Sequence, residues 1–305
     1  MKRLGITMLL CLAAVQAQPP QGVQPEAVKQ GQALARQGKL AEALALYKQE
    51  LEKTPDSMAA LNAAGVTLDL MGQTAEARKY FAKAIEAAPG AQGKAAARRA
   101  VAMSYAFDGD CANTVKYEQM VMEHWVAEKN FYQQGEMANE AARVCIDAGD
   151  LKTAETWYRK GTELGLQEPN IAPERVALWK FRLEHALGRL AARRGQKAQA
   201  EKHVAAAKAL LDGSPEMSKQ QAVFFPYLVG YVALYTGDAA GALAELAKAN
   251  QNDAFVQCLM GMAYEKTGDK AQAREMYAKA GKVTAHNPPA AFAVPFARKK
   301  LAQLN

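Results

Sequence analysis

Few residues of this chain have the types and spacing that catalysis or metal binding needs. Its four histidines, His124, His185, His203 and His286, are scattered, with no paired Glu or Cys at ligand spacing. No G-x-S-x-G, glycine-rich phosphate loop or H-E-x-x-H motif occurs. Cys258 with a distant His is the nearest approach to a hydrolytic pair, but a Cys on an Ala-rich helix is typical of a packing residue. We therefore expect no enzyme, no metal site and no cofactor.

The composition favours an all-α fold. Half of the residues are apolar but only 8% are aromatic, and Ala, Leu, Lys, Gln and Glu, which favour helices, dominate. The formal net charge is +7, and the basic clusters are short and widely separated, without an aromatic-glycine motif between them. We therefore expect no nucleic-acid partner.

The first residues have the pattern of an export signal. Lys2 and Arg3 precede a short apolar stretch, and small residues lead to Ala17, so residues 1–17 are predicted to be a signal peptide and 18–25 an extended leader. The apolar stretch is too short to span a bilayer, so no stable membrane insertion is expected. A lipid on Cys11 is a less favoured alternative because bulky Leu10 precedes it. The mature chain is expected in the periplasm or outside the cell.

The elements that would position any binding residues come from a repeated pattern. GQTAEARKYFAKA near the N-terminus and GDKAQAREMYAKA near the C-terminus share their Gly, Ala and aromatic positions. One glycine in each unit, here called the marker glycine, serves as the reference position. Small residues stand seven positions before it and five positions after it, and a large apolar residue stands nine positions after it in all units but one. The marker glycines are Gly38, Gly72, Gly109, Gly149, Gly195, Gly237 and Gly268.

This pattern predicts about seven helix-turn-helix units over residues 26–285. A glycine can take the left-handed conformation that ends a helix, and small residues let two helices approach closely. One such hairpin cannot bury its apolar faces alone, so the units must stack. Residues 286–305 are expected to form a capping helix over the end of the stack, starting near Ala290 or, because of its helix-breaking ring, at Pro295.

These residues resemble the tetratricopeptide repeat, whose spacing is matched best by the second unit: Leu61, Gly65, Leu68, Gly72, Ala77, Phe81, Ala84 and Pro89. The resemblance covers most of the mature chain and implies a right-handed α-solenoid. The middle departs from the pattern, because marker spacing is longer there and the third unit has Thr114 and Glu118 at its two packing positions.

The resemblance also places two cysteines near one another. Cys111 would begin the second helix of unit 3, and Cys145 would lie in the last turn of the following helix. In the stack of this family these helices are antiparallel neighbours, so a disulfide between Cys111 and Cys145 is expected after export. Two buried thiols are the alternative.

In tetratricopeptide proteins the first helix of each unit lines a concave groove that holds a peptide or a partner helix. Mapped by position, this groove would be cationic in the middle and aromatic toward its C-terminal end, and would suit an acidic or C-terminal peptide. Its tyrosines could instead pack between units, and its arginines could be solvated surface charges. The predicted groove residues are Asn62, Arg99, Asn139, Arg143, Arg182, His185, Arg189, Arg193, Tyr227, Tyr231, Tyr235 and Phe255.

The sequence thus predicts a non-catalytic exported scaffold that binds a protein or peptide, of acidic character, through its groove. The alternative is a structural subunit of a cell-envelope assembly, which would dock through its convex face or its terminal helix. A broad apolar patch at Phe292 and Phe296 would favour that alternative. The sequence gives no indication of the oligomeric state.

Overall fold

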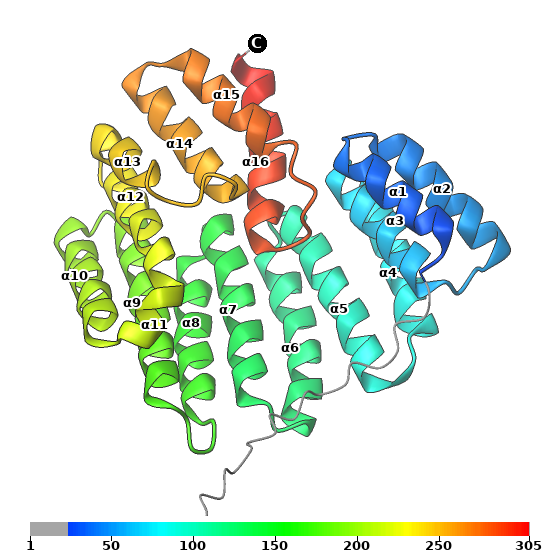
Figure 1. Cartoon of the computed structure of the whole chain (residues 1–305), viewed down its shortest axis with the longest axis horizontal. Helices are drawn as coiled ribbons and strands as arrows, with labels where there is room; N and C mark the ends of the chain where they lie inside the picture. Colours follow the sequence, from blue (N-terminus) through cyan, green and yellow to red (C-terminus); the bar gives the residue numbers. More distant parts are fainter. Residues whose placement is uncertain (1–23, 305) are drawn as a thin grey trace, which may run out of the picture.

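The chain folds into helices that follow one another in pairs (Figure 1). The structure is a computed structural model that describes residues 24–304, and this part contains helices and no strand. The predicted all-α solenoid of about seven pairs is confirmed. The pairs are α1 (Glu26–Arg36) with α2 (Leu40–Lys53), α3 (Met58–Leu70) with α4 (Thr74–Ala87), α5 (Gly90–Phe107) with α6 (Cys111–Ala127), α7 (Phe131–Ala148) with α8 (Leu151–Leu166), α9 (Pro173–Arg193) with α10 (Lys197–Gly213), α12 (Phe225–Tyr235) with α13 (Ala239–Leu246), and α14 (Ala254–Thr267) with α15 (Lys270–Ala280).

Each pair turns at its marker glycine. All seven marker glycines have positive φ angles, between 68° and 100°, a conformation that costs glycine little because it has no β-carbon. In four units an aspartate follows the glycine and begins the next helix. Asp150, for example, accepts a hydrogen bond from the backbone N–H of Thr153, which satisfies one of the free donors at the start of α8.

The glycines inside the first helices make room for the large side chains of the second helices. A β-carbon on Gly65 of α3 would lie 2.5 Å from Cε1 of Phe81 on α4, and Phe81 is fully buried. Gly261 and Tyr277 repeat this arrangement in the last pair. The small and large positions of the repeat are therefore one contact in four of the pairs, Gly31–Tyr47, Gly65–Phe81, Gly230–Leu246 and Gly261–Tyr277.

The middle of the chain has longer helices, as predicted. Helix α9 has 21 residues, whereas α1 has 11. A further short helix, α11 (Pro215–Gln221), and a 3-10 turn, η1 (Ala222–Phe224), lie between α10 and α12. In the third pair, Thr114 fills its packing position with a hydroxyl that donates to the carbonyl of Asp110, and Glu118 is fully buried.

The last helix, α16 (Pro288–Leu304), does more than cap the stack. It packs against α14 and α15, as a cap would, but also against α5 and α7 (Figure 1). It starts at Pro288, and Pro295 lies inside it, so the expectation of a start at Pro295 is wrong. The interface with the earlier helices includes Leu70, Phe107 and Val294. Helix α16 therefore joins the C-terminal end of the solenoid to its first half.

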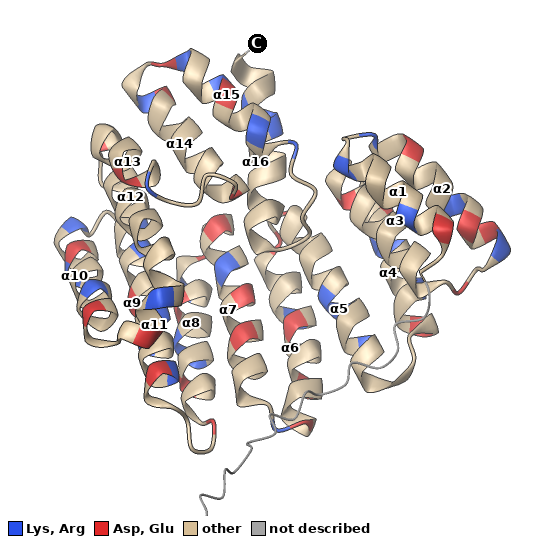
Figure 2. Cartoon of the chain, in the orientation of Figure 1, with Lys and Arg blue, Asp and Glu red and all other residues tan. Residues whose placement is uncertain are grey.

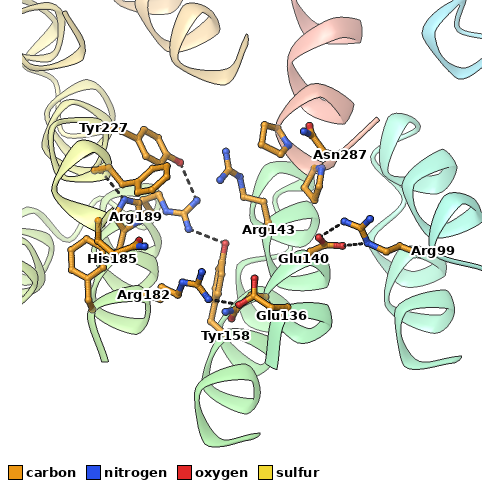
Figure 3. Close-up of a pocket in the computed structure, with 16 residues that line it drawn as sticks. Arg99, Glu136, Glu140, Arg143, Tyr158, Arg182, His185, Arg189, Tyr227 and Asn287 are labelled. Carbon is orange, nitrogen blue, oxygen red and sulfur yellow. Dashed lines mark hydrogen bonds and ion pairs between the residues drawn. The ribbon is translucent and has the colours of Figure 1, made fainter. Parts of the chain in front are cut away.

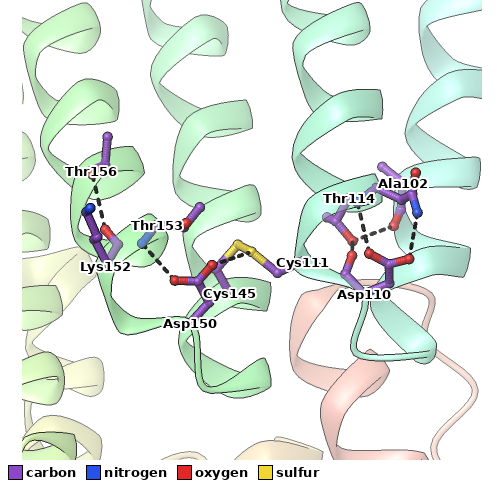
Figure 4. Close-up of a disulfide and its surroundings, with 10 residues drawn as sticks. Ala102, Asp110, Cys111, Thr114, Cys145, Asp150, Lys152, Thr153 and Thr156 are labelled. Atoms are coloured by element: carbon purple, nitrogen blue, oxygen red, sulfur yellow. Dashed lines mark hydrogen bonds between the residues drawn. A yellow bond between two sulfur atoms is a disulfide. The ribbon is translucent and has the colours of Figure 1, made fainter.

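A disulfide links α6 to α7 (Figure 4). The Sγ atoms of Cys111 and Cys145 are bonded, and their Cα atoms are 4.7 Å apart. Cys111 begins α6 and Cys145 lies near the end of α7, so the bond joins the two helix ends that face each other. Cys258 is a free, buried thiol on α14.

The predicted signal peptide and most of the leader lie outside the described residues. Within residues 24–304, none of the helices has the length and apolar character required to cross a membrane.

Candidate functional site

The largest concentration of predicted groove residues lies in one pocket (Figure 3). The pocket has a volume of about 510 Å³ and is lined mainly by the first helices α5, α7, α9 and α12. Single residues of α8, α11 and η1 and the start of α16 complete its walls. Seven of the twelve predicted residues line it: Arg99, Asn139, Arg143, Arg182, His185, Arg189 and Tyr227.

The other five predicted residues lie elsewhere. Asn62 lines a separate hollow on α1 and α3, and Arg193 and Tyr235 are half-buried beside the pocket without lining it. Tyr231 and Phe255 are 0% and 1% exposed. Their predicted place on the groove surface is wrong, because α12, α14 and α16 close around them and make them part of the core.

Two of the arginines in the pocket are neutralised by glutamates of α7. Arg99 donates from Nε to Glu140 over 2.8 Å, and a second hydrogen bond joins the same two side chains. Arg182 pairs with Glu136 across α7 and α9. These four side chains form two ion pairs along the pocket (Figure 3), so that part of its wall carries no net charge.

Arg189 has a different environment, because its hydrogen bonds within the described residues go to phenol hydroxyls rather than to carboxylates. It is 4% exposed and donates to the hydroxyls of Tyr158, over 2.9 Å, and Tyr227, over 3.1 Å. Its Nε has no hydrogen-bond partner within residues 24–304, and none of the carboxylates there forms an ion pair with it. A buried guanidinium without a counter-ion is costly. Arg189 is therefore a cation without a paired carboxylate, and only the more distant charge of Asp147 acts on it.

Arg143 lies on the facing helix, with one weak ionic partner. Its Nε lies 3.4 Å from a carboxylate oxygen of Asp147, and its guanidinium carbon is 4.2 Å from the centre of the Phe255 ring. Burial raises the pKa of Asp147, although Arg143, Arg189 and Arg193 act in the opposite direction. Arg143 contacts this carboxyl group, and Arg189 and Arg193 lie near enough for their charges to act on it, so positive groups outnumber negative ones at this end of the pocket.

His185 does not add to this charge. Burial lowers its pKa well below the usual value, and Arg189 and Arg143 lower it further. Its Nε2 lies 3.4 Å from the carbonyl oxygen of Phe224, so the ring can donate to that oxygen and hold η1 beside the pocket. Its role is therefore structural within the site.

Several lining residues were not among the predicted ones. Tyr158, on the second helix of its pair, stands nine positions after the marker Gly149, where the repeat predicts a large packing residue. It is buried, but its hydroxyl also reaches Arg189. Phe224 belongs to the inserted turn η1 and is 46% exposed. Asn287, Pro288 and Pro289 come from the start of α16, and nothing local in their sequence indicates that they return to the groove.

The described residues contain no group of His, Cys, Asp and Glu side chains that could hold a metal ion. The arrangement in the pocket suits recognition of an anion by arginine and tyrosine donors, next to aromatic surface.

Comparison with known families identifies the repeat. The model of the tetratricopeptide repeat matches residues 28–92 and 256–284. No curated protein sequence matches the chain. Among solved structures, a tetratricopeptide repeat protein from Parabacteroides merdae is similar over 92% of this chain and 97% of its own, with 16% identity and a TM-score of 0.50. The apo form of RapI is similar over 91% of this chain and 98% of its own, with 13% identity and a TM-score of 0.52. At these identities the likeness concerns the fold.

Proposed function

Since the chain is a tetratricopeptide-repeat protein, we propose that it is a non-catalytic scaffold that binds a segment of another protein in its concave pocket. The ligand is an acidic or C-terminal peptide. The observation that carries this proposal is the pair Arg143 and Arg189, which face one pocket from neighbouring first helices. Stacked repeats hold such helices side by side, so the two side chains can act on one ligand.

The charges of the pocket support an anionic ligand. Arg189 has no carboxylate partner within the described chain, and Arg143 shares only Asp147 with its neighbours. An arriving carboxylate would accept hydrogen bonds from charged donors in a desolvated site, where such bonds are stronger than in water. On α2 and α10, by contrast, residues of both charge signs occur together (Figure 2).

Export of the chain is part of the same proposal. Residues 1–17 have the pattern of a signal peptide, and the Cys111–Cys145 disulfide supports an oxidising compartment, where such bonds persist. We place the protein in the periplasm or outside the cell.

The alternative, a structural subunit that docks through its convex face or α16, has less support. Phe292 and Phe296 are only partly exposed and pack with α14 and α15. Their apolar surface is therefore largely used within the chain rather than presented to a partner.

Site-specific photo-crosslinking separates these two functions. A photoreactive amino acid replaces Asn139, which lines the pocket, or, as the control, the exposed Glu163 on the second helix α8. After irradiation in extract of cells that produce the protein, adducts are identified by mass spectrometry. The proposal expects a specific adduct from position 139 and none from position 163. The reverse pattern would support docking through the convex face.

A further inference from the structure

We propose that the end of the molecule formed by α15 and the last half of α16 docks on the surface of a membrane that carries anionic lipid headgroups. This surface is separate from the pocket, and the proposal does not depend on what the pocket binds. It comes from the distribution of charge along the chain, the exposure of the basic side chains at this end and the contacts that hold them together.

The net charge of the chain is concentrated in its last segment. Residues 264–305 contain eight lysines and arginines but only three aspartates and glutamates. Residues 18–263, by contrast, contain basic and acidic residues in equal number. The whole net side-chain charge of the chain without its predicted signal peptide therefore comes from this segment, which makes up the end of α14 with α15 and α16.

Most of these basic side chains are exposed and unpaired. Lys279 pairs with Glu275, and Lys300 pairs with Glu265, each over 2.7 Å. The other six are exposed and form no ion pair with a carboxylate of residues 24–304: Lys266, Lys270, Arg274, Lys282, Arg298 and Lys299. This end of the molecule therefore presents more positive charge than its own carboxylates neutralise.

Contacts between the three helices bring these side chains together. Arg298 of α16 donates, over 3.2 Å, to the backbone carbonyl that precedes Lys282. The ion pair of Lys300 with Glu265 holds α16 against the end of α14, next to Lys266. Helix α15 and the C-terminal part of α16 lie side by side at one edge of the molecule (Figure 1), and both carry basic residues (Figure 2). The basic residues of the last segment thus form one surface.

The opposite charge is concentrated in the middle of the chain. Residues 101–150, which include α6 and α7, contain nine acidic and three basic residues. The molecule therefore has a basic end and an acidic middle, and a negatively charged surface attracts the one and repels the other. This separation orients the chain with α15 and α16 toward an anionic membrane.

The types of side chain favour lipid headgroups over nucleic acid. Four of the six unpaired residues are lysines, whose ammonium groups on flexible stems can follow a fluid layer of phosphates without a fixed geometry. Surfaces that bind single-stranded nucleic acid add aromatic side chains on which bases stack. At this end Tyr277 is buried, and Phe296 is partly buried and packs within the chain.

The attachment is electrostatic rather than an insertion. Leu301 and Leu304, in the last turns of α16, are half-buried, so this end offers little apolar surface to the interior of a bilayer. Within residues 24–304, no helix is long and apolar enough to cross a membrane. Binding that depends on exposed charges weakens as salt screens them.

Binding to lipid vesicles tests the proposal. The chain that starts at residue 18 keeps every described helix, because the first of them begins at Glu26. Its co-sedimentation is measured with phosphatidylcholine vesicles that contain either no phosphatidylglycerol or about one third of it. We expect at least about tenfold stronger binding to the anionic vesicles, and loss of this difference at about 0.5 M salt.

Two variants with the same change of charge locate the surface. The first should bind the anionic vesicles at least about tenfold more weakly than the wild type, and combines Lys266→Gln, Lys270→Gln, Lys282→Gln and Lys299→Gln. The second should bind like the wild type, and carries substitutions at exposed positions of α10 and α11, Lys197→Gln, Lys202→Gln, Lys208→Gln and Lys219→Gln. Arg143→Gln, in the pocket, should also leave vesicle binding unchanged, so this proposal and the proposed function can fail separately.

Other results would overturn the proposal. Equal binding to neutral and anionic vesicles would show that headgroup charge is not recognised. An equal loss of binding in the two four-lysine variants would show that net charge alone, and not the surface of α15 and α16, attracts the chain to the vesicles. Tighter binding to a DNA duplex than to anionic vesicles, at the same phosphate concentration, would identify a nucleic-acid surface instead.

Discussion

His286 and Asp69 are 217 positions apart in sequence, yet Nε2 of His286 lies 2.8 Å from a carboxylate oxygen of Asp69. The Asp69 side chain is completely buried, and its other oxygen accepts from the hydroxyl of Ser104 over 2.8 Å. The imidazole also stacks on the ring of Phe107, at a centroid distance of 5.3 Å. This contact fixes the segment before α16 to α3 and α5, and so holds one wall of the pocket in place.

Removal of this histidine should destabilise the whole chain. His286→Ala leaves the Asp69 carboxyl group buried with Ser104 as its remaining partner, and loss of one member of a buried pair costs about 3 kcal/mol. Thermal unfolding followed by circular dichroism measures the loss. Lys282→Ala, at an exposed position of the same segment, is the matched control. Equal melting temperatures for the two variants would show that the contact does not hold α16.

The effect of His286→Ala should depend on pH. Burial raises the pKa of Asp69, while His286 and Ser104 lower it, so the pKa rises further in the variant. When the pKa of a carboxyl group is higher in the native state than in the unfolded state, the native state is more stable at a pH below the unfolded pKa. This extra stability is lost as the pH rises through the native pKa. The deficit of the variant against the wild type should therefore be larger at pH 7 than at pH 4. A deficit that grows on acidification would contradict this assignment.

The contact between Gly65 and Phe81 should tolerate no added methyl group. Gly65→Ala places a β-carbon 2.5 Å from the Phe81 ring, and overpacking of this kind costs about 1 to 3 kcal/mol. Gly213→Ala is the control, because a β-carbon there meets no atom within 4 Å. Urea unfolding should give a lower midpoint for Gly65→Ala than for Gly213→Ala. Identical midpoints would mean that the helices of the second pair can separate without cost.

The disulfide should stabilise the junction of α6 and α7. Its ends are 34 residues apart, and closing a loop of this size contributes about 2 to 4 kcal/mol. Cys111→Ser with Cys145→Ser should lower the melting temperature, and reductant should lower that of the wild type but not that of the double variant. If reductant has no effect on the wild type, the bond contributes nothing under those conditions.

The repeat could be predicted from the sequence because its determinants are local. The marker glycines end helices through their own backbone conformation, and pairs such as Gly65 and Phe81 recur at the same spacing in four of the units. The placing of Arg99, Arg143 and Arg189 in one pocket also followed from position within the repeat. In a regular stack of repeats, residues at the same position of each unit lie on the same face of the solenoid.

The remaining features depend on contacts between distant segments. Tyr231 and Phe255 occupy first-helix positions that would face a groove in an open stack, but α16 folds back and closes that end. The apolar residues Phe292 and Phe296 indicate that α16 packs against an apolar surface. They do not indicate which helices form that surface. The inserted turn that carries Phe224 likewise breaks the regular spacing, so its place beside the pocket could not be predicted from the repeat.

The most direct test of the central claim is the affinity of a ligand for variants of the positive end of the pocket. A fluorescent peptide from the partner found by crosslinking is titrated by anisotropy. Arg143→Gln should weaken binding about thirtyfold, which corresponds to a loss of about 2 kcal/mol. Asp147→Asn removes the internal competitor for the same guanidinium and should tighten binding. Arg159→Gln, at an exposed position of α8 outside the pocket, should leave binding unchanged. The same dissociation constant for all three variants and the wild type would contradict the account.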